Sequence, residues 1–176
     1  ATVRLGGQVI GFSDPNTSSV QKGESLEDTI RMLSGYADAI ILRHPEVGAA
    51  LRASQVSRVP IINAGDGSNE HPTQTLVDLF TIWETQGHLE DLHVGLVGDL
   101  RFSRTVHSLV KALSSLGTQT FYCICPPALS LPEELQASSE SLGSRFEWVE
   151  SISAVIPKLN ILYMTRLQLE RLPEDL

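Results

Sequence analysis

The feature that most constrains the fold is a regular alternation between short β-rich runs and longer runs with helical spacing of apolar residues. Clear β-rich runs are "DAIILR" (38–43), "VPIINA" (59–64), "LHVGLVGD" (92–99) and "NILYMT" (160–165), with helical patterns between them. Such alternation is typical of βαβ units. It predicts an α/β fold with parallel sheets and right-handed crossovers.

The remaining elements follow from local signals. "PTQTLVDLFTIWETQ" (72–86) is the strongest helix, because Pro72 stands at its first position and Gly87 follows its end. Ser25 and Asp28 form a capping box at the start of another helix, and Gly35 stops it. We further expect strands at 8–12, 118–125 and 145–150, and helices at 25–36, 46–54, 103–117, 131–143 and near 152–156.

The polar segment 87–91, after the longest helix, indicates a domain boundary. The sequence therefore predicts two doubly wound parallel-sheet domains, 1–87 and 88–176, joined by a long bridging helix. Both domains are expected to be incomplete. The first residues, "VRLGG", read as the tail of a helix, and "LPEDL" ends the chain without returning to either core. We therefore expect the chain to be a fragment.

The composition indicates a globular protein of 176 residues, with 41% hydrophobic and 19% charged residues. No stretch approaches the roughly 20 apolar residues that cross a bilayer, and the N-terminus lacks the layout of a signal peptide. A net charge of −8 argues against a nucleic-acid partner. Cys123 and Cys125, the only cysteines, are interpreted as buried strand thiols, which fits a reducing cytoplasm.

Cationic and amide side chains collect where strands end. In open parallel sheets, ligands bind beyond the carboxyl ends of the strands, so residues at these ends are candidates for a site. They carry positive charge, an imidazole or an amide: Arg43, His71, Arg101, Arg104, Arg166 and Gln168. Helix N-termini near His71 and Ser103 also favour negative charge. The pattern predicts a site for more than one anionic group.

Each residue also has a structural interpretation. His71 could be a variant N-cap, and Gln74 could cap the same helix from its third position. The arginines could be surface charges, and Ser18 and Lys22 could belong to a solvated loop. The other histidines lack metal-binding spacing, and the sequence has no HExxH, CxxC, GxSxG, P-loop or GxGxxG motif. We therefore expect no metal and no cofactor, and a reaction that proceeds by positioning and electrostatic stabilisation.

Four segments, in order, are more specific: "RHPEVGA", "NAGDGSNEHPTQTLVDLFTI", "LVGDLRFSRTVHSL" and "LYMTRLQLER". They resemble the catalytic chains of the aspartate/ornithine carbamoyltransferase family over nearly the whole sequence. The "HPTQ" segment is common to both branches, whereas "MTRLQ" resembles the aspartate branch. The resemblance implies carbamoyl transfer from carbamoyl phosphate to the amine of L-aspartate in pyrimidine synthesis.

The resemblance also assigns roles to residues. Arg43 and His71 would contact carbamoyl phosphate, and Gln74 would hold its amide. These three residues would be the catalytic residues. Arg104, Arg166 and Gln168 would bind the carboxylates of aspartate. Ser18 and Lys22 would reach the active site of a neighbouring subunit in a homotrimer of catalytic chains. The resemblance leaves open whether regulatory chains join that trimer.

One departure from the family pattern bears on activity. The family's Ser-Thr-Arg-Thr phosphate loop has no counterpart before Gln8, and "FSRT" at 102–105 lies in the second predicted domain. The C-terminal Pro-Leu loop and closing helices are missing as well. We therefore expect the chain alone to be inactive or nearly so.

Three rival functions remain. The first is a non-catalytic homologue that only binds ligands or partners, against which the retained Arg43, His71 and Gln74 argue. The second is a carbamoyltransferase that uses ornithine or another amine, although a cationic acceptor would favour a carboxylate where Arg166 stands. The third is a nucleotide-binding Rossmann module, which the missing glycine fingerprint disfavours.

Overall fold

The computed structural model of the chain describes residues 2–11, 23–67 and 69–166. By packing, the chain forms two compact units: residues 1–42 with 48–62, and residues 43–47 with 63–176. Both have the predicted α/β character. Within the described ranges, no helix is both long and apolar enough to cross a membrane.

The first unit contains α1 (Leu26–Leu33), α2 (Ala49–Val56) and most of β1 (Ile40–His44), together with the start of β2 (Ile61–Asp66). The two strands pair in a two-stranded sheet, and a small core of buried residues includes Ile30, Ile40 and Ala53. The Ser25 Oγ accepts a hydrogen bond of 3.1 Å from the backbone N of Asp28. This confirms the predicted N-terminal cap of α1.

The predicted strand at 8–12 is wrong for residues 8–11, which have no regular structure. Val9 and Ile10 are 67% and 65% exposed. Alternating apolar residues favour extended backbone, but a strand exists only where a second strand supplies hydrogen bonds. The described part of the chain offers none to these residues. The first three residues of the "VRLGG" segment lie in a short 3-10 helix, η1 (Thr2–Leu5).

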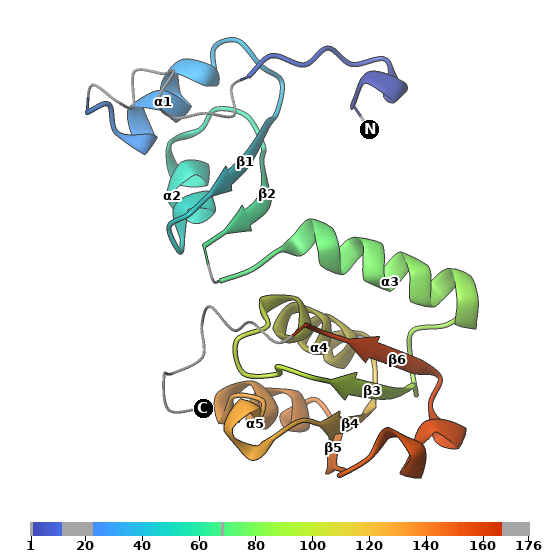
Figure 1. Cartoon of the computed structure of the whole chain (residues 1–176). Coiled ribbons are helices and arrows are strands. Elements are labelled where there is room, and N and C mark those ends of the chain that lie inside the picture. Colours follow the sequence, from blue (N-terminus) through green and yellow to red (C-terminus); the bar gives the residue numbers. More distant parts are fainter. Residues whose placement is uncertain (1, 12–22, 68, 167–176) are drawn as a thin grey trace. The chain divides into compact units, whose positions relative to one another are not determined.

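The second unit is built on a four-stranded sheet in the order β5-β4-β3-β6 (Figure 1). Its strands are β3 (His93–Val97), β4 (Thr120–Ile124), β5 (Arg145–Trp148) and β6 (Ile161–Met164). All neighbouring strands run parallel. The chain passes from β3 outward to β4 and β5, then returns to β6 on the other side of β3. This reversal of strand order is the topological switch of a doubly wound sheet.

The described part of this unit contains the α-helices α3 (Pro72–Gln86), α4 (Arg104–Leu116) and α5 (Glu133–Ser141). The bounds of α3 match the prediction, and Gly87 ends the helix in the left-handed region at φ 77°. The helix predicted near 152–156 is instead two 3-10 turns, η5 (Ile152–Ala154) and η6 (Ile156–Lys158). A third turn, η4 (Pro127–Leu129), follows β4.

The core of the second unit lies between the sheet and these helices. Val94, Leu96 and Phe121 from the sheet are fully buried, as are Leu109 and Leu113 from α4. Apolar side chains of α3 also pack against this core, so α3 belongs with the second unit in this chain. The division into domains 1–87 and 88–176 stays a prediction.

A buried amide fixes the amino edge of this sheet. Gln119, 2% exposed, accepts a hydrogen bond of 3.0 Å from the backbone N of Leu92. Its Nε2 lies 2.8–3.2 Å from three carbonyl oxygens, those of Leu89, Leu113 and Gly117. One side chain therefore ties the turn before β3 to the end of α4.

We expect Gln119→Ala to lower the free energy of unfolding by about 3 kcal/mol, since it leaves several buried backbone groups without partners. Gln136→Ala is the matched control, because the Gln136 amide forms a solvent-exposed hydrogen bond to Glu140 on its own helix, and a change within about 0.5 kcal/mol is expected. Tryptophan fluorescence during urea unfolding measures both, since Trp83 and Trp148 lie in the second unit. Equal effects of the two substitutions would contradict the assignment.

Candidate functional site

The candidate site lies at the switch point, where β3 and β6 end side by side. Gly98 follows β3 with φ 108°, and a Cβ added there would lie 2.4 Å from the carbonyl oxygen of Thr165. The backbone N of Thr165 donates to the carbonyl of Val97 at 2.9 Å. Only a glycine permits this close approach. It brings the residues after β3 next to Arg166, which follows β6.

The loop between β3 and α4 is held by a buried carboxylate. Asp99 is fully buried, and its Oδ1 accepts hydrogen bonds from the backbone N of Arg101 and of Phe102, at 3.0 and 2.9 Å. At the end of the loop, Ser103 Oγ accepts a hydrogen bond of 3.2 Å from Thr165 Oγ1. The start of α4 is thereby joined to the end of β6.

Arg104, the first residue of α4, reaches the glycine loop that precedes α3. Its guanidinium donates a hydrogen bond from Nη1 to the carbonyl of Gly67. A Cβ added at Gly65 would lie 3.5 Å from the His71 ring and 3.8 Å from Arg104 Nη1. Arg104 and His71 are therefore neighbours across this loop, although 33 positions separate them in the sequence.

His71 occupies the N-cap position of α3, but its side chain makes no capping hydrogen bond. The imidazole Nδ1 lies 3.2 Å from Thr73 Oγ1. The structure thus does not support a capping role for the half-buried His71 side chain. A half-buried imidazole beside an arginine suits an anionic ligand.

Gln74 does not cap the helix either. Its Nε2 donates a hydrogen bond of 2.9 Å to Oδ1 of Asp78, one turn further along α3. The Oδ2 of Asp78 accepts a second bond, of 3.1 Å, from Tyr163 Oη in β6. Sequence reasoning missed Asp78 and Tyr163. The spacing of Gln74 and Asp78 was readable in the sequence, but the partner in β6 was not.

Arg43 is exposed and lies next to the last residue of β1. The adjacent His44 accepts a hydrogen bond of 2.8 Å at its carbonyl from the backbone N of Gly67. A Cβ at Gly67 would lie 2.5 Å from the carbonyl oxygen of Pro45. The segment after β1 therefore packs on the same glycine loop that Arg104 contacts.

The remaining predicted residues are placed less fully. Ser18, Lys22 and Gln168 lie outside the described residues. Arg166 is exposed at the end of β6, directly after Thr165. Arg101 is directed elsewhere: its Nη1 donates to the carbonyl of Ala128 at 3.2 Å, and its guanidinium lies over the Phe102 ring. The structure thus brings together the junctions that carry Arg43, His71, Arg104 and Arg166.

The chemistry of this cluster favours anions. Arg104 and His71 lie near each other at the starts of two helices, where backbone N–H groups also favour anions, and arginine binds two oxygens of one anion at once. Among the described residues, no group of three or more histidine, cysteine or acidic side chains could hold a metal ion.

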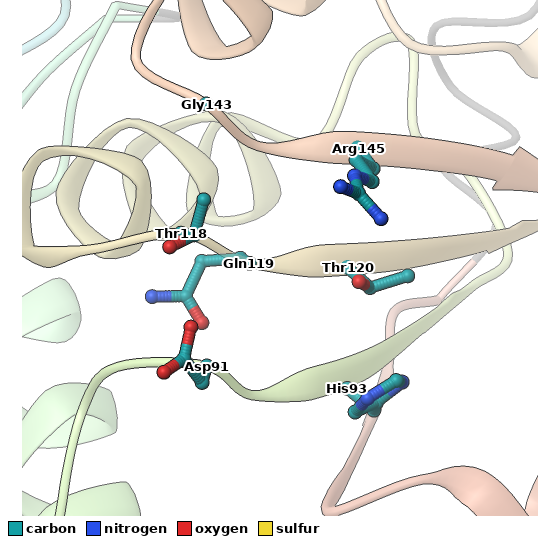
Figure 2. Close-up of a pocket in the computed structure, with 7 residues that line it drawn as sticks. All are labelled: Asp91, His93, Thr118, Gln119, Thr120, Gly143 and Arg145. Carbon is teal, nitrogen blue, oxygen red and sulfur yellow. The ribbon is translucent and has the colours of Figure 1, made fainter.

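A depression of about 230 Å³ lies at the opposite, amino edge of the sheet (Figure 2). Its lining includes His93, Thr120 and Arg145, which project from three neighbouring strands, and the fully bonded Gln119. None of the predicted site residues that the structure describes lines it. Because ligands of open parallel sheets bind at the carboxyl edge, we do not assign a ligand to this depression.

Comparison with known proteins identifies the class. The family model described as aspartate/ornithine carbamoyltransferase, carbamoyl-P binding domain, matches residues 1–84. The chain belongs to the aspartate/ornithine carbamoyltransferase family.

Similar proteins include members of the aspartate branch. The aspartate carbamoyltransferase catalytic subunit of Chromobacterium violaceum is 51% identical over 174 residues, which cover 99% of this chain and 57% of that protein. The catalytic subunit of M. jannaschii aspartate transcarbamoylase is 50% identical with a TM-score of 0.90, covering 98% of this chain and 56% of the other. The chain therefore spans somewhat more than half the length of these relatives.

A Trypanosoma cruzi aspartate transcarbamoylase, solved in complex with N-(phosphonacetyl)-L-aspartic acid, is 39% identical with a TM-score of 0.87. The match covers 97% of this chain and 55% of that one. The structural match thus includes residues of both units.

We expect Gly98→Ala to lower the free energy of unfolding by about 3 kcal/mol, because a side chain there adds a backbone clash to the cost of positive φ. Gly87→Ala is the matched control. Gly87 has φ 77° with nothing within 4 Å of an added Cβ, so it should cost only about 1 kcal/mol. Urea unfolding followed by tryptophan fluorescence compares them, and equal losses would show that the approach to Thr165 is unimportant.

His107 should make stability depend on pH. Burial lowers the pKa of His107, outweighing its hydrogen bond to the Leu100 carbonyl. The unfolded chain therefore binds a proton at higher pH than the folded chain. The stabilising contribution of neutral His107 is complete above about pH 6.5 and is lost as pH falls towards the lowered folded pKa.

We accordingly expect the stability of the protein to fall between pH 7 and pH 5, and His107→Gln to flatten that decline. His88→Gln is the control, because His88 is exposed. Urea midpoints measured across this pH range test the expectation. A decline that is equally steep in wild type and His107→Gln would refute it.

Proposed function

We propose that the protein carrying this chain transfers the carbamoyl group of carbamoyl phosphate to the amine of L-aspartate. The products are N-carbamoyl-L-aspartate and phosphate, a step of pyrimidine synthesis. One observation carries the proposal. Arg104 bonds the loop beside His71, while the start of its helix bonds Thr165 beside Arg166, so donor-side and acceptor-side groups belong to one cluster.

On the donor side, Arg43 and His71 bind carbamoyl phosphate, and Gln74 holds its amide. His71 then donates a hydrogen bond to the carbonyl oxygen, where negative charge grows as the amine attacks. A preorganised donor of this kind is typically worth about 3 kcal/mol in the transition state. The unused capping capacity of His71 supports this role.

On the acceptor side, Arg104, Arg166 and Gln168 bind the two carboxylates of aspartate. Two arginines match a dicarboxylate in charge and in geometry. The attacking amine must lose a proton as the carbon–nitrogen bond forms, and the departing phosphate is basic enough to accept it. Catalysis then rests on orientation and charge stabilisation, without a protein general base.

The solved relatives support these substrates. Trypanosoma cruzi aspartate transcarbamoylase has been solved with carbamoyl phosphate and aspartate together, and with carbamoyl aspartate and phosphate. Those ligands are the substrates and products of the proposed reaction. The two solved chains that bind them are 38–39% identical to this chain, and each match covers 95% of this chain.

We further infer a homotrimer of catalytic chains in the cytoplasm, in which Ser18 and Lys22 complete a neighbour's site. Regulatory chains are left open. Because the chain spans 57% of its first curated relative, we expect the 176-residue chain alone to be inactive or nearly so. Carbamoyl aspartate formation by the purified chain, at a rate near that of the protein of natural length, would overturn that expectation.

The proposal is tested with the protein at its natural length. Carbamoyl phosphate plus aspartate should give carbamoyl aspartate, whereas ornithine should give no product. Arg166→Ala should raise the KM for aspartate by about 100-fold or more, since it removes a charged partner of a carboxylate. Arg145→Ala, at the amino edge of the same sheet, is the control and should leave KM unchanged. Turnover of ornithine, or no turnover at all, would contradict the proposal.

A further inference from the structure

Asp78 lies at the centre of a hydrogen-bonded bridge between α3 and β6. Its two carboxylate oxygens have different partners: Oδ1 accepts from Gln74 Nε2 at 2.9 Å, and Oδ2 accepts from Tyr163 Oη at 3.1 Å. All three side chains are partly buried. A Gln–Asp pair one turn apart on an exposed helix face contributes only a few tenths of a kcal/mol. The tyrosine, 85 positions away in the sequence, makes this pair part of the tertiary structure.

The carboxylate decides which way the Gln74 amide points. An ionised carboxylate can only accept hydrogen bonds, so the amide must turn its NH₂ group towards Asp78. The Gln74 oxygen is then directed away, and among the described residues no hydrogen bond occupies it. A carbamoyl NH₂ group needs such an acceptor. Without Asp78, the amide could rotate and present a donor instead.

Tyr163 holds Asp78 from the sheet. Burial chiefly raises the pKa of Tyr163, a hydrogen bond with Thr105 lowers it, and the charge of Asp78 raises it. The tyrosine hydroxyl therefore stays protonated at neutral pH and donates to Asp78. The Oγ1 of Thr105 also lies 3.2 Å from the Oγ of Ser103, which accepts a hydrogen bond from Thr165 Oγ1. Hydrogen bonds thus link the first turns of α3 and α4, which carry Gln74 and Arg104, to Tyr163 in β6 and to Thr165, which precedes Arg166.

We propose that Asp78 is a positioning residue. It fixes the Gln74 amide with its oxygen towards the carbamoyl nitrogen, and through Tyr163 it sets the position of that amide relative to the acceptor side of the site. The inference rests on the proposed carbamoyl transfer and adds the residues that orient the group reading the carbamoyl amide.

The test is a double-mutant cycle in the protein at its natural length. Asp78→Asn keeps the size of the side chain but lets it donate, so Gln74 loses its fixed orientation. We expect kcat/KM for carbamoyl phosphate to fall by about 10-fold or more, the value of one well-placed hydrogen bond, and KM for aspartate to change less than about 3-fold. Gln74→Ala/Asp78→Asn should be no slower than Gln74→Ala alone.

Independent, multiplicative losses in the double variant would overturn the proposal, because Asp78 would then act without Gln74. Glu140→Gln is the matched control, since Gln136 and Glu140 form the same one-turn pair at 2.9 Å on the exposed face of α5. It should leave all kinetic constants unchanged. An equal loss in this control would also overturn the proposal.

Tyr163→Phe provides a second variant that keeps the buried ring and the Gln74–Asp78 pair. It should lower kcat/KM for carbamoyl phosphate about 3-fold or more, with the thermal unfolding midpoint confirming a folded protein. Activity equal to wild type would refute the bridge. Wild type that makes no carbamoyl aspartate contradicts the proposed function itself, whereas active wild type with an unchanged Asp78→Asn variant contradicts only this inference.

Discussion

The arrangement of the second unit depends on the contact between the ends of β3 and β6, where the order of the strands reverses. A parallel pair with this connectivity leaves a crevice beyond its carboxyl end. The segments that follow the two strands are loops that can carry functional groups. Gly98 allows the backbone after β3 to lie against Thr165, and Ser103 binds the same residue from the start of α4. Arg104 and Arg166 stand directly beside these contacts, so the backbone geometry sets where both charges lie.

The electrostatic character of the cluster contrasts with the protein as a whole. The chain has a net charge of −8, yet arginine and imidazole groups meet at the helix starts and strand ends of one edge. Helix N-termini add to their attraction for anions. Two acidic residues near this edge have structural partners: Asp99 orders the loop before α4 through its Oδ1, and Asp78 bonds Gln74 and Tyr163. Their carboxylates are thus engaged in shaping the cluster.

Sequence patterns predicted most of the fold because local rules decide most of it. The bounds of α3 followed from Pro72 and Gly87, and the succession of strands and helices indicated parallel sheets. Failures occurred where a distant partner decides the structure. Residues 8–11 have a strand pattern but no strand partner among the described residues, and the link from Asp78 to Tyr163 crosses 85 positions of sequence. Strand ends indicated Arg104 and His71 as site residues, but only coordinates reveal that they meet across the Gly65–Gly67 loop.

The central claim is that side chains from separate strand–helix junctions form one pocket for a phosphorylated donor and a dicarboxylic acceptor. The most direct measurement is a crystal structure of the protein at its natural length with N-(phosphonacetyl)-L-aspartic acid. The account predicts the phosphonate beside Arg43 and His71, with the aspartate carboxylates on Arg104 and Arg166. An analogue bound at the amino edge near Arg145, or contacts to only one of these two groups of residues, would contradict it.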